Sequence, residues 1–121
     1  MPTASGLTEL RPTEWTVNDV SDGDNDDVTC TKTGVAGKAH YITFLCMSTD
    51  NTTSGSPVIT AELKDNGVTI LECWPIDIDA SPTFVTFPNP IRISTGSDAV
   101  FFGDAGSGSD QIAFCMGGYT A

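Results

Sequence analysis

The sequence predicts an all-β fold: a two-sheet antiparallel sandwich of the jelly-roll type with eight or nine short strands. Short runs rich in Val, Ile, Phe and Thr follow one another along the chain, and turn-forming Gly, Pro, Asn and Asp residues separate them. No segment has a helical period. The 121 residues suffice for a single core, so we expect one sandwich domain over residues 15–121 and an extended N-terminal arm over residues 1–14.

The N-terminal arm is polar and contains Pro2 and Pro12, which fix φ and favour extended backbone. A polar terminus frays unless contacts hold it, so we expect this arm to dock. The favoured docking site is a neighbouring chain, and the alternative is the sandwich domain of the arm's own chain. Residues 1–15 have neither a basic region nor an apolar run, so no signal peptide or transmembrane span is expected.

The strand expected at His40–Ser48 is the strongest in the chain. Both of its faces are apolar, which predicts cover on one side by the opposite sheet and on the other side by something else. Regular alternation assigns the residues to the two faces as Ile42, Phe44 and Cys46 on one and Tyr41, Leu45 and Met47 on the other.

A hairpin is expected next, with the strand Val58–Lys64 alternating between apolar and polar residues before a turn at Asp65–Gly67. A three-residue loop with its glycine in the left-handed conformation pairs Ala61 with Leu71. A two-residue loop at Asp65-Asn66 would place Glu72 on the apolar face, at a cost of several kcal/mol. The three-residue loop is therefore our prediction.

The remaining strands are shorter, and two of them flank Pro88-Asn89-Pro90. Two prolines in three residues predict an abrupt corner, at which the chain could cross between sheets. These strands are expected at Trp15–Val20, Val28–Val35, Phe84–Phe87, Ile91–Ser94, Ala99–Gly103 and Gln111–Gly117.

The charge of the chain narrows its possible partners. Sixteen acidic residues against five basic ones give a net charge of -11. Such a surface repels phosphate backbones and anionic lipids, so neither nucleic acid nor membrane is expected as a partner.

Four cysteines show no paired spacing of the kind that marks a metal site or a dense disulfide framework. Three of them lie in apolar strand-like runs, so we interpret them as small buried hydrophobes with free thiols. Only His40 could join them in a zinc site, and we therefore expect no metal and no cofactor. The four are Cys30, Cys46, Cys73 and Cys115.

An acidic loop at 22–27 suggests calcium, because Asp22, Asp24 and Asp26 alternate as in the first half of an EF-hand loop. The pattern then fails, since Asp27 occupies the sixth position and Thr33 the twelfth. A solvated loop is the favoured interpretation, and a calcium site of another type is the alternative.

Catalytic patterns are weak throughout the chain. Asp77 and Asp79 form a DxD pair, but nothing else points to a nucleotide-sugar enzyme, so two solvated carboxylates are expected. The loop Gly103–Gly108 superficially resembles a protease serine loop but lacks Ser at the decisive position, and a G-x-S-x-G elbow is absent. His40, the only histidine, is expected to hydrogen-bond a loop. No catalytic residue is therefore predicted.

Aromatic residues offer one further hypothesis, because exposed rings can stack on sugars. Most of them lie in apolar strand runs, so use in the core or at an interface is favoured. The candidates are Trp15, Tyr41, Trp74 and Tyr119.

The part of the chain from Gly37 to Tyr119 resembles small virion proteins of tailed bacteriophages, several of which are β-sandwich decoration (cement) proteins. The motifs that carry the resemblance are Gly37–Thr43, Leu63–Leu71, Phe87–Ile91, Thr95–Ser97 and Gly117–Tyr119. They are turn and core residues, and they supply no catalytic residue. The cysteines and the acidic loop have no counterpart in this resemblance.

The resemblance implies a capsid decoration protein that binds the outside of the phage head as a homotrimer or homodimer and clamps major capsid protein subunits. Assembly in the host cytoplasm would agree with free cysteines. A tail or head appendage that binds host glycans is the alternative, and enzymatic activity is not expected. Capsid contacts are expected at Pro2, Leu7, Leu10, Arg11, Pro12 and Trp15.

Overall fold

The computed structural model describes residues 14–21, 26–49, 60–73, 83–104 and 111–121. These residues form eight β-strands, and no helix occurs among them. The strands are β1 (Glu14–Val20), β2 (Val28–Lys32), β3 (His40–Thr49), β4 (Thr60–Asp65), β5 (Val68–Cys73), β6 (Thr83–Arg92), β7 (Ala99–Asp104) and β8 (Ile112–Thr120).

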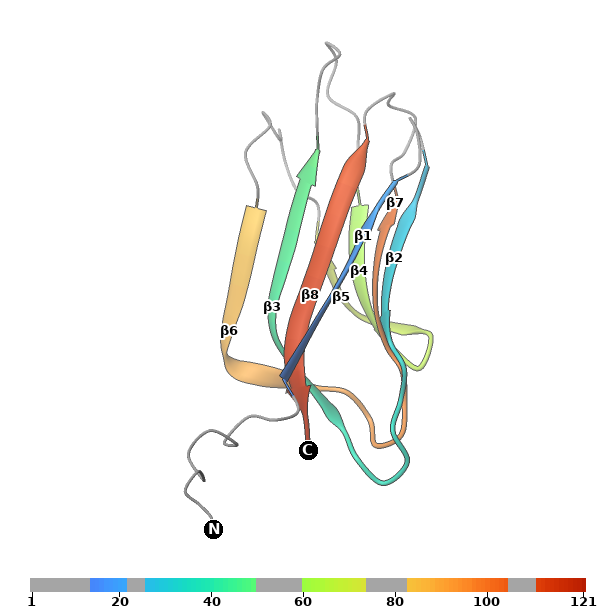
Figure 1. Ribbon diagram of the computed structural model, residues 1–121, viewed down its shortest axis with the longest axis vertical. Helices are drawn as coiled ribbons and strands as arrows, with labels where there is room; N and C mark the ends of the chain where they lie inside the picture. The colour runs from blue at the N-terminus through green and yellow to red at the C-terminus, as the bar shows by residue number, and fades with distance from the viewer. Residues whose placement is uncertain (1–13, 22–25, 50–59, 74–82, 105–110) are drawn as a thin grey trace.

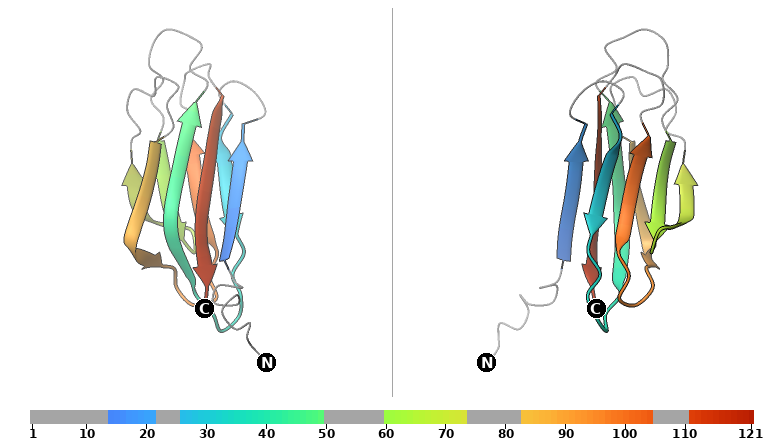
Figure 2. Two further views of the ribbon diagram at one scale, coloured as in Figure 1. Left: turned by 60° about the vertical axis from the view of Figure 1, so that its left-hand side comes forward. Right: turned by 90° about the vertical axis from the view of Figure 1, so that its right-hand side faces the viewer.

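The strands form two four-stranded sheets that face each other (Figures 1 and 2). One sheet has the order β1-β8-β3-β6 and the other β2-β7-β4-β5, and every pairing is antiparallel. The first strand thus pairs with the last, the second with the seventh, the third with the sixth and the fourth with the fifth. This order defines a jelly roll and confirms the predicted fold class.

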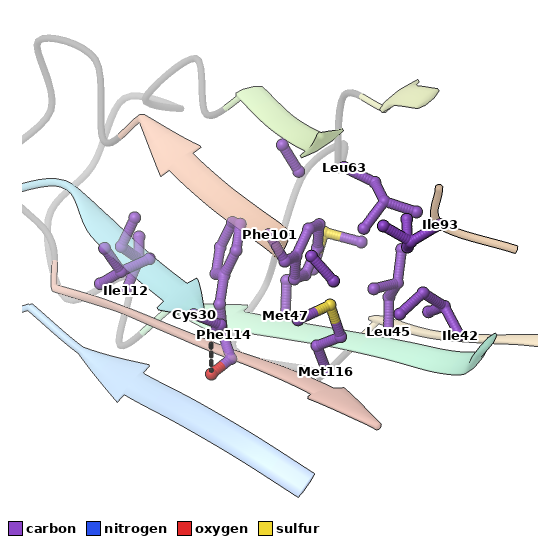
Figure 3. Close-up of a cluster of buried hydrophobic side chains, with 13 residues drawn as sticks. Cys30, Ile42, Leu45, Met47, Leu63, Ile93, Phe101, Ile112, Phe114 and Met116 are labelled. Carbon is purple, nitrogen blue, oxygen red and sulfur yellow. Dashed lines mark hydrogen bonds between the residues drawn. The ribbon is translucent and has the colours of Figure 1, made fainter. Parts of the chain in front are cut away.

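The core lies between the two sheets and is built from the inward residues of each strand (Figure 3). At its centre the rings of two buried residues, Phe101 on β7 and Phe114 on β8, pack together with centroids 4.8 Å apart. Thirteen buried residues form the core: Val28, Cys30, Ile42, Leu45, Met47, Ala61, Leu63, Ile93, Ala99, Phe101, Ile112, Phe114 and Met116.

A β-bulge at Thr43 changes the two faces of β3. The register with β8 moves from Ile42↔Gly118 to Phe44↔Gly117, so Thr43 is the extra residue. The faces predicted from regular alternation are therefore wrong. Ile42, Leu45 and Met47 are buried in the core, and Tyr41, Phe44 and Cys46 face outward.

The β4–β5 hairpin also differs from its predicted register. Asp65 pairs with Val68, so the loop is the two-residue turn Asn66-Gly67, with φ of 53° and 82°. A bulge follows, and Ala61 pairs with Cys73 in place of Leu71. The bulge shifts β5 by one residue, so the half-buried Leu71 lies opposite the buried Leu63 and Glu72 lies opposite Glu62. Ala61 and Leu63 are inward as predicted.

Strand β6 is continuous across Pro88-Asn89-Pro90, where two separate strands were predicted. The chain bends sharply there, as Figure 1 shows, but the segments on either side both pair with β3. The corner is therefore a large bulge within one sheet and not a crossing between sheets. Strand β2 ends at Lys32, before the predicted end at Val35, and the chain then turns at Ala36-Gly37.

Candidate interaction face

The outward surface of the β1-β8-β3-β6 sheet, called here the aromatic face, is the strongest candidate for a binding site. Among its described residues only Glu14 and Arg92 are charged, and both lie on edge strands. Residues that lie opposite one another on neighbouring strands form four rows across this face. Named in the strand order β1, β8, β3, β6, the first three rows are Glu14–Tyr119–Tyr41–Arg92, Thr16–Gly117–Phe44–Thr86 and Asn18–Cys115–Cys46–Phe84. The fourth row, over β1, β8 and β3, is Val20–Ala113–Ser48.

Two pairs of stacked rings occupy the aromatic face. The rings of Tyr41 and Tyr119 have centroids 5.0 Å apart and planes 9° apart. Those of Phe44 and Phe84 have centroids 5.3 Å apart and planes 9° apart. Phe84 is 60% exposed, an unusual position for a large apolar side chain unless a partner covers it.

Two local features of the sequence produce this arrangement. The bulge at Thr43 places Tyr41 and Phe44 on the same side of β3, which regular alternation would not do. A glycine at 117 then leaves room for the Phe44 ring, because a Cβ added there would overlap the ring. The Thr43 hydroxyl donates to the carbonyl of Gly117 at 3.2 Å and holds the bulge against β8.

A groove lies beside the rings, where β1, β8 and β3 meet. It has a volume of about 350 Å³ and is partly open to solvent. Two threonines, a glutamate and two aromatic residues contribute to its wall, a combination that suits a small polar ligand. The lining residues are Glu14, Trp15, Thr16, Thr43, Phe44 and Gly118.

The outward surface of the β2-β7-β4-β5 sheet has a different character. The Thr69 hydroxyl donates to Glu62 at 2.6 Å, and the Lys64 ammonium lies 4.9 Å from the centroid of the Phe102 ring. The Lys64 charge thus covers the Phe102 ring from the same sheet. The contrast between the two outer surfaces favours the aromatic face as the one that contacts a partner.

His40 has a structural position, buried at one end of the sandwich and 1% exposed. Its Nε2–H donates to the carbonyl of Thr33 at 2.8 Å, because that carbonyl can only accept. Its Nδ1 then accepts from the Thr120 hydroxyl at 2.8 Å, and this hydroxyl accepts from the Trp15 indole N–H at 3.0 Å. The expectation that His40 hydrogen-bonds a loop is confirmed.

The described cysteines fall into two classes. Cys30 is in the core, where its thiol donates to the carbonyl of Phe114 at 3.3 Å (Figure 3). Burial, followed by the nearby charge of Asp19, raises the pKa of the Cys30 thiol to about 12. Cys46 and Cys115 are half-buried on the aromatic face, so the prediction of buried thiols is wrong for these two. All three are free.

Most of the predicted capsid-contact residues and several of the other candidate site residues lie outside the described ranges. Trp15 is described: its ring lies edge-on to His40, and the Lys32 ammonium lies 5.6 Å from its centroid. Asp26 and Asp27 are exposed. Outside the described residues lie Pro2, Leu7, Leu10, Arg11, Pro12, Asp22, Asp24, Trp74, Asp77, Asp79 and the segment 105–110.

Within the described ranges, no group of three or more His, Cys, Asp or Glu residues is placed to hold a metal ion. These ranges also contain no helix that is long and apolar enough to cross a membrane.

No protein-family model matches the chain, and no curated protein matches it. Among solved structures, a crystal structure of FlhE has a TM-score of 0.45 and 7% identity, covering 88% of this chain and 95% of that one. The CBM36-1 domain of a multidomain xylanase from the hindgut metagenome of Trinervitermes trinervoides has a TM-score of 0.43 and 20% identity, covering 91% and 92%. At these TM-scores, neither similarity supports a functional argument.

Proposed function

We propose that the protein is a non-enzymatic virion structural protein, a capsid decoration protein that docks on major capsid protein subunits through the aromatic face. The main support for this proposal is that the aromatic face exposes stacked rings and has few charged residues, although the chain has a net charge of -11. Aromatic side chains are enriched in the cores of protein interfaces, and charged residues are depleted there.

The charge distribution supports a protein partner for this face. Binding removes water from both surfaces, and a desolvated charge must find a partner or it costs affinity. The central rows of the aromatic face contain no charged residue, so docking there avoids that cost. The acidic remainder of the surface would keep many neighbouring copies soluble and apart.

The copy number in the particle tests this function most simply. Quantitative mass spectrometry of purified virions should find the protein in hundreds of copies, comparable with the capsid protein. A few copies per virion would place it in the tail and overturn the decoration role, and complete absence would overturn a virion role altogether.

The predicted arm can be tested by truncation. Because β1 begins at Glu14, the deletion should stop at residue 13. If the arm reaches a second capsid subunit, the truncated protein binds heads more weakly while its unfolding midpoint is unchanged. Equal binding by the two forms would contradict a role for the arm.

Glycan binding is a second candidate function, favoured by the groove beside the rings. Its hydroxyls and carboxylate could hydrogen-bond a sugar while Phe44 packs against the sugar ring. On a glycan array, Thr16→Val should abolish any signal, because it removes a hydroxyl but keeps the side-chain shape. The matched control is Thr31→Val on the opposite sheet, which should leave the signal intact. An array with no signal for the unmodified protein would reject this candidate.

A further inference from the structure

Two cysteines that are distant in sequence lie directly opposite each other on the aromatic face. Cys46 on β3 pairs with Cys115 on β8 in the antiparallel ladder. Opposite residues in such a ladder have Cα atoms about 4.5 or 5.5 Å apart, according to their hydrogen-bonding pattern. A disulfide spans Cα distances of about 4.4–6.8 Å, so either pattern places the pair within bonding reach.

The two side chains also project from the same side of the sheet. Both residues are half-buried, whereas the inward neighbours of Cys115 on β8, Phe114 and Met116, are fully buried. The pKa of the Cys115 thiol is raised first by burial and second by the charge of Cys46.

Access to the pair is better than access to the core thiol. Cys30 is 1% exposed and donates to a carbonyl, so an external reagent cannot reach it without unfolding. The cross-strand neighbours of the pair are Asn18 on β1 and Phe84 on β6. Neither is charged, so no neighbour in this row would repel an anionic reagent.

We propose that Cys46 and Cys115 are a reversible redox pair, which forms an intramolecular disulfide across β3 and β8 by exchange with a low-molecular-weight disulfide of the glutathione type. This site is independent of the function proposed above. The covalent link would join the two central strands of the aromatic face.

The exchange balances in two steps. One cysteine, as its thiolate, attacks a sulfur of the oxidised glutathione, forms a mixed disulfide and releases one reduced glutathione. The second cysteine thiolate then attacks the protein sulfur of the mixed disulfide and releases the other glutathione. Two protein thiols are oxidised, one glutathione disulfide is reduced to two thiols, and the thiol protons pass to solvent and the leaving thiolates.

The test uses the full chain in buffers of graded reduced-to-oxidised glutathione ratio, followed by acid quench and non-reducing peptide mass spectrometry. The expected product is a monomer lighter by two hydrogen atoms, with one linked peptide pair that contains Cys46 and Cys115. A reductant should restore the starting mass. Cys46→Ser and Cys115→Ser should each lose the link completely, and Cys73→Ser, the control, should keep it.

Four outcomes would overturn the proposal. The first is glutathione adducts without the linked peptide, the second is a link through Cys30 or Cys73, and the third is a link between two chains. A protein that stays reduced while a urea-unfolded sample in the same buffer forms disulfides would also reject it. Because the unmodified protein gives these results directly, the test does not depend on the folding of any variant.

Discussion

At the scale of single residues, Thr120 holds together three parts of the chain. Its hydroxyl donates to His40 on β3 and accepts from Trp15 on β1, and His40 in turn donates to the carbonyl of Thr33 after β2. The sequence alone predicted that His40, the only histidine, hydrogen-bonds a loop. It could not indicate Thr120 as the partner, because these residues are 80 positions apart.

Thr120→Val should destabilise the fold by about 1–3 kcal/mol, because it leaves the buried His40 Nδ1 and the Trp15 indole N–H without partners. Guanidinium unfolding measures the change. Thr31→Val, an exposed threonine on β2, is the control and should change stability by no more than about 0.5 kcal/mol. Equal effects of the two variants would contradict the network.

Cys30 should make stability depend on alkaline pH. Its thiol keeps its proton up to a pKa of about 12 in the folded protein, whereas the value without burial is 9.0. Between these two pKa values, the Cys30 thiol is ionised in the unfolded chain and protonated in the folded chain. The free energy of unfolding therefore falls as pH rises, by about 1.4 kcal/mol per pH unit. Unfolding titrations of Cys30→Ala should show a shallower fall than the unmodified protein. Identical slopes would contradict an un-ionised Cys30.

At the scale of elements, the sequence predicted strands more reliably than register. The strands at Trp15–Val20 and Ala99–Gly103 and the alternation of β4 follow from apolar and turn residues alone. Bulges in β3, in the β4–β5 hairpin and in β6 are set by contacts with the neighbouring strand, which a single sequence does not contain. Each bulge changes which side chains face outward, so the aromatic face could not be predicted either.

The β2–β3 connection and the β6–β7 connection contact each other at Gly34. Its N–H donates to Asp98 at 2.7 Å, and a Cβ added at Gly34 would overlap the backbone carbonyl of Gly96. Gly34→Ala should therefore destabilise the protein by about 1–3 kcal/mol, since backbone must move to admit it. Ala36→Ser, at an exposed site in the same connection, is the control and should have little effect in the same unfolding assay. A neutral Gly34→Ala would show that the two connections are not in close contact.

At the scale of the whole molecule, the two outer surfaces of the sandwich have different chemistry. On the β2-β7-β4-β5 surface, Thr69 donates to Glu62 and the Lys64 ammonium lies over the Phe102 ring, while the aromatic face leaves Phe84 60% exposed beside Phe44. The sequence predicted that β3 would be covered on both sides. The structure places one side of β3 in the core and its other apolar side on the aromatic face, where we propose that the capsid binds.

Binding of Phe84→Asp to heads that lack the protein tests this central claim most directly, with Val68→Asp as the control. Val68 is 65% exposed and lies on the other sheet, so the two changes are matched in charge and exposure. Phe84→Asp should weaken head binding by about thirtyfold or more, equivalent to about 2 kcal/mol, because a carboxylate is then desolvated at the interface. Val68→Asp should bind as the unmodified protein does. Unchanged binding by Phe84→Asp, with both variants folded, would contradict docking through the aromatic face.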